Sequence, residues 1–143
     1  MKQRVRAVLI TPHETMLVIK RIRPGIAPYR VIVGGGVEET DASLEDALLR
    51  EVREEIAADA QIVRLLHTAE NPKGETEFFY LARVGTWNFD DRTGPEFARD
   101  DRGEYLLEEV PLTTDALAAL NLLPEEISAV LSRALEAGDL LPG

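Results

Sequence analysis

Apolar and polar residues alternate with a period of two along the start of the chain. Residues 4–9 alternate in this way, and a second apolar run follows at residues 16–19. The turn-forming residues 11–14 separate the two runs, which predicts a hairpin of two strands. A third short apolar run, residues 29–33, stops at three glycines, residues 34–36. We interpret it as a strand that ends at a flexible glycine corner.

The period changes to that of a helix beyond the glycines. Apolar side chains recur at every fourth position: Leu44, Leu48, Val52 and Ile56. Ser43 and Asp46 resemble a capping box at the start of this segment. The pattern therefore predicts a capped amphipathic helix directly after the glycine corner.

The second half of the chain predicts further strands and helices. Residues 61–69 and 75–84 are rich in β-forming residues, and a turn at residues 71–74 makes them a second predicted hairpin. Residues 90–103 are charged and aperiodic, which predicts a long loop of a kind that often carries function. A strand or extended arm and two helices are expected at residues 105–112, 114–120 and 124–135.

Length and composition favour one folded, soluble domain. The 143 residues, of which 45% are hydrophobic and 29% charged, suffice to bury a core without disulfides. No linker divides the chain, so we expect a single domain over residues 1–143. The first ten residues lack the continuous apolar run of a signal peptide or membrane span, which favours a cytoplasmic protein.

Charge and cysteine content narrow the choice of partners. The 26 acidic and 16 basic residues give a formal charge of −10. A surface of this sign repels nucleic acid backbones and anionic membranes, so we expect neither as a partner. A small anion remains compatible, because a bound divalent cation reverses the local charge. The chain has no cysteine, which excludes disulfides and thiolate zinc sites.

Three glutamates cluster in the predicted helix. Glu51, Glu54 and Glu55 are three or four residues apart, a spacing that lets their carboxylates converge on one side of a helix. Magnesium prefers such oxygen ligands. Arg50 lies four residues before Glu54 and is placed to hold that carboxylate in one rotamer. The alternative is a solvated helix face on which glutamate and arginine merely form surface pairs.

The order of strand, glycine corner, capped helix and glutamate cluster resembles the signature of the Nudix hydrolase family, in its MutT-like form. The Arg-Glu-Val-Arg-Glu-Glu core at residues 50–55 matches that signature in full. The resemblance implies an α/β fold, an α/β/α sandwich in which a mixed, mostly antiparallel curved sheet lies between helices. It extends over most of the chain but is strong only at this box.

The box departs from the family pattern at three places. One extra residue lies between the glycines and Arg50, so the first glutamate of the signature falls on Asp41 or Ala42. Ala57 replaces the glycine that usually follows the helix, and Val33 stands where a proline often precedes the glycines. These changes affect backbone shape and the support of Arg50 rather than the metal-binding glutamates.

The resemblance implies hydrolysis of a pyrophosphate bond in a nucleoside diphosphate linked to another group. Magnesium, with manganese as a substitute, would be held by Glu51, Glu54, Glu55 and the carbonyl of Gly34. Glu55, Glu54 and Arg50 are the predicted catalytic residues. Glu55 is the first candidate for the general base, and two acidic residues outside the box are further candidates: Glu96 and Glu104.

Weaker signals concern the substrate and assembly. Three arginines and a tyrosine precede the glycines: Arg21, Arg23, Tyr29 and Arg30. The residues predicted to contact substrate are Arg23, Tyr29 and Arg30 of this group, Gly35 of the glycine corner and Glu96 of the long loop. The expected partner is a small-molecule nucleotide, and a homodimer is compatible with the apolar stripe of the last helix. The alternatives are a catalytically weak nucleotide-binding or regulatory domain on the same fold, and an acidic interaction domain that binds no metal.

Overall fold

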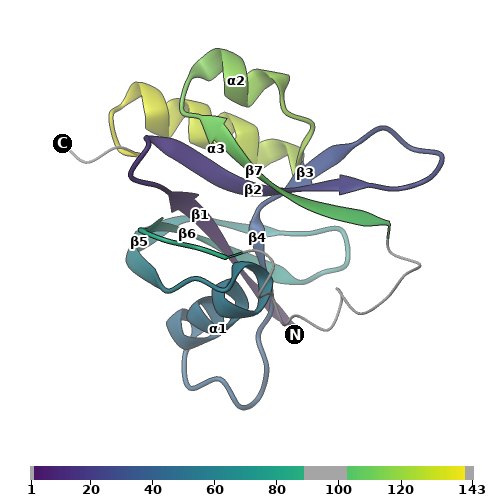
Figure 1. The fold of residues 1–143 in the computed structure, drawn as a ribbon. Coiled ribbons are helices and arrows are strands. Elements are labelled where there is room, and N and C mark those ends of the chain that lie inside the picture. The colour runs from purple at the N-terminus through teal and green to yellow at the C-terminus, as the bar shows by residue number, and fades with distance from the viewer. Residues whose placement is uncertain (1, 89–102, 141–143) are drawn as a thin grey trace.

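A curved mixed sheet forms the centre of the structure, a computed structural model that describes residues 2–88 and 103–140 (Figure 1). Eight strands and three helices lie within these described residues. In chain order they are β1 (Gln3–Ile10), β2 (Thr15–Ile22), β3 (Tyr29–Val31), β4 (Val33–Gly36), α1 (Leu44–Ile56), β5 (Ala60–Glu70), β6 (Thr76–Val84), β7 (Glu104–Pro111), α2 (Thr114–Ala119), β8 (Leu122–Leu123) and α3 (Glu125–Glu136).

The strand β1 lies in the middle of the sheet and has three partner strands. It pairs in parallel with β6 over its full length. Its other edge is shared, because residues 4–7 pair with β4 whereas Leu9 and Ile10 pair with β2. β2 also pairs with β3 and β7, both antiparallel. The sheet therefore divides between β4 and β2, and the chain crosses this division as it passes from β3 to β4.

Helices cover both faces of the sheet, and a separate apolar core lies under each (Figure 1). The core under α1 contains Leu48 and Val52 of the helix together with Leu9 and Leu17 of the sheet. The core on the other face contains residues of α2, α3 and the sheet. The expected α/β/α sandwich with a mixed curved sheet is confirmed. No helix in the described part of the chain is long and apolar enough to cross a bilayer.

Most of the expected elements are present, with two corrections. Both hairpins, the capped helix and the two C-terminal helices form as the sequence pattern predicts. The glycines, however, do not end a strand: residues 34–36 lie within β4 and pair with residues 4–6 of β1. The interpretation of residues 29–33 as one strand was also wrong, because β3 and β4 have different partners. The short strand β8, which pairs with β3, was not predicted.

Both ends of α1 show why the helix has these limits. The Ser43 side chain accepts a hydrogen bond from the Asp46 N–H at 3.1 Å, so the predicted cap is present on the serine side. The helix ends at Ala57, whose φ of 50° and ψ of 47° are left-handed. This conformation favours glycine, because a Cβ there crowds the following carbonyl oxygen.

Replacing Ala57 by glycine should therefore stabilise the protein. Relief of the left-handed strain, offset by the greater backbone entropy of unfolded glycine, predicts a gain of about 0.5–1 kcal/mol in the free energy of unfolding. Urea denaturation measures this quantity. Ala137→Gly is the matched control, because Ala137 follows α3 with a right-handed φ of −80° and should gain nothing. A loss of stability in Ala57→Gly would contradict this account of the helix end.

Candidate functional site

The three clustered glutamates lie beside the buried face of α1. Leu48 and Val52 of the helix are fully buried in the core. Glu51 and Glu55, one helical turn apart, are both buried, and the side chain of Glu51 is 11% exposed against 30% for that of Glu54. Burial of two ionisable carboxylates is costly unless each has a partner. The surroundings of α1 supply those partners.

The guanidinium of Arg50 connects α1 to β4 and to the loop between them. Its Nε and Nη2 each donate a hydrogen bond of 2.9 Å to the Asp41 carboxylate. Nη1 donates to Glu51 and to Glu54, both at 3.1 Å. Nη2 also donates to the carbonyl of Gly36 at 3.0 Å. A planar guanidinium suits this task, because its donors point in fixed directions.

Asp41 and Arg50 raise each other's preference for the charged form. The hydrogen bonds from Arg50 are the main cause that lowers the pKa of Asp41, and a backbone hydrogen bond from Glu38 lowers it further. The Asp41 hydrogen bond is likewise the main cause that raises the pKa of Arg50. The Asp41 side chain is only 6% exposed. The pair is therefore an ion pair shielded from water on one side.

Two glycines of β4 lie so close to other groups that a side chain has no room. The Gly34 N–H donates a 2.8 Å hydrogen bond to Glu55 Oε2, and a Cβ at Gly34 would clash with the carbonyl oxygen of Val5. A Cβ at Gly35 would lie 2.6 Å from Glu51 Oε2. The glycines thus let the strand contact both buried carboxylates of α1.

The donor atoms of this site suit a hard divalent cation. Glu51, Glu54 and Glu55 offer carboxylate oxygens, and the strand backbone offers carbonyls, the ligands that magnesium prefers. Within the described residues, however, no three acidic or histidine side chains already surround one metal position. Glu51 and Glu54 are instead drawn together by Arg50. The chemistry fits a metal held by few carboxylates, as is usual for magnesium.

Comparison with known proteins agrees with this arrangement of parts. The NUDIX domain family matches residues 1–130. The chain belongs to the Nudix family. Membership in this family supports the expected enzyme class, a hydrolase that acts on acid anhydrides. No curated protein sequence matches the chain.

Solved structures show the same fold at low sequence identity. A NUDIX family hydrolase from Clostridium perfringens is 15% identical, with a TM-score of 0.69 over 95% of this chain and 97% of that one. An ADP-ribose pyrophosphatase from Streptococcus suis is 20% identical, with a TM-score of 0.65 over 96% and 91%. A MutT structure described for Aliivibrio salmonicida and Vibrio cholerae is 18% identical, with a TM-score of 0.62 over 95% and 96%.

The departures from the Nudix signature now have a structural description. Asp41, and not the exposed Ala42, binds Arg50 in place of the first glutamate. Aspartate is one methylene shorter than glutamate, and the extra residue in the loop accompanies this shorter side chain. Ala57 occupies the left-handed position where the family has glycine. Val33 is buried and pairs with Ala7 in the sheet.

The residues predicted to contact substrate lie in different places. Arg23 is exposed after β2, and Tyr29 is half-buried on β3. Arg30 forms a two-pronged ion pair with Glu108, at 2.9 and 3.3 Å, on the sheet face away from α1. The structure therefore does not bring Arg30 to the glutamates. Glu96 falls outside the described residues.

A row of two tyrosines and one arginine was only partly evident from the sequence. Arg21 of β2 pairs in register with Tyr29 of β3 and with Tyr105 of β7. Its guanidinium lies over the Tyr105 ring, 3.8 Å from the ring centre. Leu17 and Ile19 of β2 belong to the core under α1, so alternation places Arg21 on that same face. Tyr105 was missed, because strand register is not visible in a single sequence.

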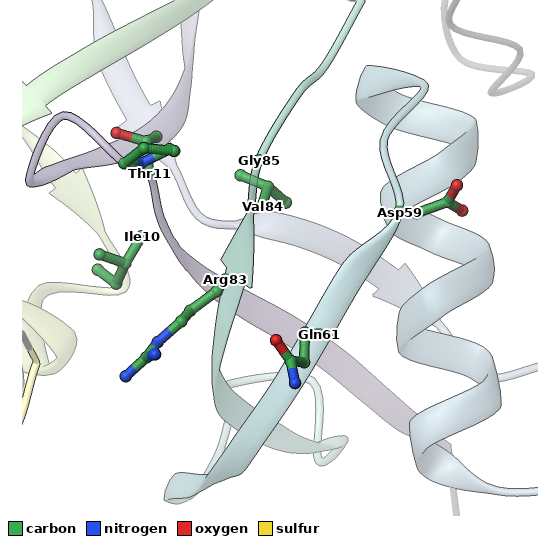
Figure 2. Close-up of a pocket in the computed structure, with 8 residues that line it drawn as sticks. Ile10, Thr11, Asp59, Gln61, Arg83, Val84 and Gly85 are labelled. Atoms are coloured by element: carbon green, nitrogen blue, oxygen red, sulfur yellow. The ribbon is translucent and has the colours of Figure 1, made fainter. Parts of the chain in front are cut away.

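A hollow of about 430 Å³ lies outside this site (Figure 2). Its lining includes Ile10 at the end of β1, Thr11 directly after it, and Arg83 and Val84 at the end of β6. The glycine strand β4 pairs with the opposite end of β1, at residues 4–7. The hollow therefore contains none of the box residues and does not mark the catalytic centre.

Asp41→Asn should destabilise the Nudix domain at neutral pH, because it removes the charged partner of Arg50. We expect a loss of about 1–3 kcal/mol in the free energy of unfolding. The folded pKa of Asp41 is lowered, so its contribution is complete above the unfolded pKa, about 3.9, and disappears as pH falls through the folded pKa. Denaturation at pH 7 and at successively lower pH measures the difference between wild type and variant.

Asp59→Asn is the matched control for this prediction. Asp59 pairs with Arg53 at 2.8 Å, but their side chains are 85% and 61% exposed. An exposed pair contributes less than about 1 kcal/mol. Equal losses in the free energy of unfolding for Asp41→Asn and Asp59→Asn would contradict the stabilising role of the Asp41–Arg50 pair. So would a difference between wild type and Asp41→Asn that stays the same at low pH.

Gly35→Ala should lower the rate of hydrolysis strongly and the melting temperature only slightly. A Cβ there meets the end of the Glu51 side chain, which has to move from its present position. Displacement of a positioned group such as this proposed metal ligand by about 1 Å costs on the order of 100-fold in rate. Thermal melting and steady-state hydrolysis measure the two effects. Gly85→Ala is the control, since no atom lies within 4 Å of a Cβ at Gly85. Unchanged hydrolysis in Gly35→Ala would contradict the prediction.

Proposed function

We propose that the chain is a magnesium-dependent hydrolase that cleaves a pyrophosphate bond in a nucleoside diphosphate linked to another group. The whole of residues 1–143 acts in this proposal as one Nudix domain. The candidate substrates are nucleoside triphosphates and ADP-ribose or another sugar nucleotide. The main support is that Arg50 binds Glu51, Glu54 and the carbonyl of Gly36, while the Gly34 N–H of the same strand binds Glu55.

Magnesium, or manganese in its place, would be held by Glu51, Glu54, Glu55 and the carbonyl of Gly34. A bound divalent cation neutralises phosphate oxygens and lowers the pKa of a bound water. Two facts about the chain support this assignment. The carboxylates of Glu51 and Glu55 lie against Gly35 and Gly34, where no side chain of the strand separates them from its backbone. Arg50 also holds two of them in defined rotamers.

Glu55, Glu54 and Arg50 are the proposed catalytic residues, and Arg50 positions Glu54. Glu55 is the first choice for the general base that removes a proton from the attacking water. Its Oε2 accepts a 2.8 Å hydrogen bond from the Gly34 N–H, which holds the carboxylate against the glycine strand. Glu104, at the start of β7, and Glu96 are the further candidates for this role.

The row of Tyr29, Arg21 and Tyr105 supports a nucleotide as the substrate. The Arg21 guanidinium lies over the Tyr105 ring, and Tyr29 is the register partner of Arg21 on the neighbouring strand. Aromatic rings and a guanidinium offer stacking surfaces and hydrogen-bond donors of the kind that bind nucleobases and phosphates. The row lies on the same face of the sheet as α1. The solved structure described as an ADP-ribose pyrophosphatase makes ADP-ribose one compound to test.

The alternative is a catalytically weak nucleotide-binding or regulatory domain on the same fold. The altered positions Asp41 and Ala57 favour it, whereas the presence of all three glutamates favours the enzyme. The proposal includes a homodimer as one assembly state of the protein, beside a monomer. Light scattering of the purified protein determines it directly.

A substrate panel tests the proposal. Release of phosphate or nucleotide is measured from nucleoside triphosphates, ADP-ribose and dinucleoside polyphosphates, with and without magnesium. We expect metal-dependent turnover that falls at least about 100-fold in Glu54→Gln and in Glu55→Gln. Glu45→Gln, an exposed glutamate on the same helix, should retain activity. Nucleotide binding without turnover would favour the alternative, and neither binding nor turnover would overturn both.

A further inference from the structure

Two adjoining hollows lie between the start of β1 and the turn that joins β5 to β6. One, of about 280 Å³, is lined in part by Arg4 and Arg6. The other, of about 340 Å³, is lined in part by Lys2. Lys73 and Glu75 line both, so the two are parts of one depression, here termed the Lys73 hollow.

The Lys73 hollow lies on the face of the sheet away from α1. Val5 and Ala7 of β1 pack in the core under α1. Arg4 and Arg6 alternate with them and therefore point to the opposite face. The strand β4 shows the same division, because a Cβ at Gly36 would be nearest to Arg4, whereas one at Gly35 would meet Glu51 of α1.

The cations of the hollow outnumber its anions. Arg6 is paired with Glu77 at 2.9 Å. For Lys2, Arg4 and Lys73, the described part of the chain supplies no side-chain ion pair or hydrogen bond. The acid lining the hollow is Glu75, which accepts a hydrogen bond from Asn71 at 3.0 Å.

The charge of this region contrasts with that of the whole chain. The three cations and Glu75 leave a local charge of about +2 in a protein of formal charge −10. The pKa of Glu75 is lowered, first by the Asn71 hydrogen bond and then by the charges of Arg4, Lys2 and Lys73. The fields of all three cations therefore reach one point in the hollow.

The backbone holds these cations close together although they repel one another. The Thr76 N–H donates to the carbonyl of Lys2 at 3.1 Å, which joins the start of β1 to β6. The Lys73 turn is closed by a 3.0 Å hydrogen bond from the Gly74 N–H to the carbonyl of Asn71. An anion with several charges would offset this repulsion without any rearrangement of the backbone.

We propose that the Lys73 hollow binds a compact oligophosphate, a ligand with two or three linked phosphate groups, at a site separate from the glutamate cluster. Lysine and arginine are the usual partners of phosphate oxygens. The volume of the hollow suits a small ligand, and the acidic remainder of the surface disfavours a long polyanion. The oligophosphate is either free or the tail of a nucleotide, and both share the recognised chemistry.

Isothermal titration calorimetry with inorganic tripolyphosphate tests the proposal. EDTA is present, so that metal-dependent binding at the glutamate cluster does not contribute and the result is independent of the proposed hydrolysis. Wild type should bind, and affinity should fall about fivefold for each cation removed in Arg4→Gln, Lys73→Gln and the double variant. Glu75→Gln should bind about fivefold more tightly, a gain that misfolding cannot produce.

Arg83→Gln is the matched control. Arg83 is exposed, and its replacement removes one positive charge, as Lys73→Gln does. It lines the hollow at the other end of β1, away from the Lys73 hollow (Figure 2). Its affinity for tripolyphosphate should equal that of wild type. Equal loss in Arg83→Gln and Lys73→Gln would show attraction by net charge only and overturn the site. Absence of binding to wild type at millimolar tripolyphosphate would overturn it as well.

Further ligands distinguish the sources of the phosphate. If ATP and tripolyphosphate bind wild type with equal affinity, and Lys73→Gln weakens the binding of both, a free oligophosphate is the recognised group. Tighter binding of ATP, with the same response to the variants, would identify a nucleotide tail. Binding of RNA or of vesicles with anionic lipid in place of tripolyphosphate would overturn the proposal in favour of a macromolecular surface.

Discussion

The guanidinium of Arg50 is the group through which α1, the glycine strand β4 and the loop between them are joined. It donates to Asp41, Glu51, Glu54 and the carbonyl of Gly36. Without this cation, three carboxylates would lie near one another with little water to screen them, and repulsion would separate them. The geometry of the proposed metal site therefore depends on a residue that is not itself a proposed metal ligand.

This dependence explains how the box tolerates its changes. The function of the position before α1 is to present a carboxylate to Arg50, and Asp41 does so with a shorter side chain and a longer loop. The position after α1 requires a left-handed residue, and Ala57 adopts that conformation at some cost in stability. Both changes preserve the contacts at the glutamates, which agrees with a site retained for chemistry.

The division of the sheet separates the surfaces available to ligands. Because β1 shares one edge between β2 and β4, the glycine strand lies directly against α1. The face under α1 carries the buried glutamates and the tyrosine–arginine row. The opposite face, at the start of β1, carries the cations of the Lys73 hollow. The two proposed positions for phosphate in this acidic protein therefore lie on opposite faces of the sheet, one acting through a metal and one through side chains.

The sequence by itself determined the family, most of the elements and the residues of the candidate site. Periodicity located the hairpins and α1, because it records which side chains face a core. The box located the three glutamates and Arg50, because their spacing along a helix is local. These features depend on residues within a few positions of one another, which a single sequence displays directly.

Only the tertiary structure decided the choices that depend on distant residues. It selected Asp41 over Ala42 as the partner of Arg50, because the loop conformation follows from packing and not from counting residues. It showed that the glycines form a strand, since their pairing partner lies about thirty residues earlier in the chain. It turned Arg30 toward Glu108 and brought Tyr105 beside Arg21, because strand register sets which side chains are neighbours.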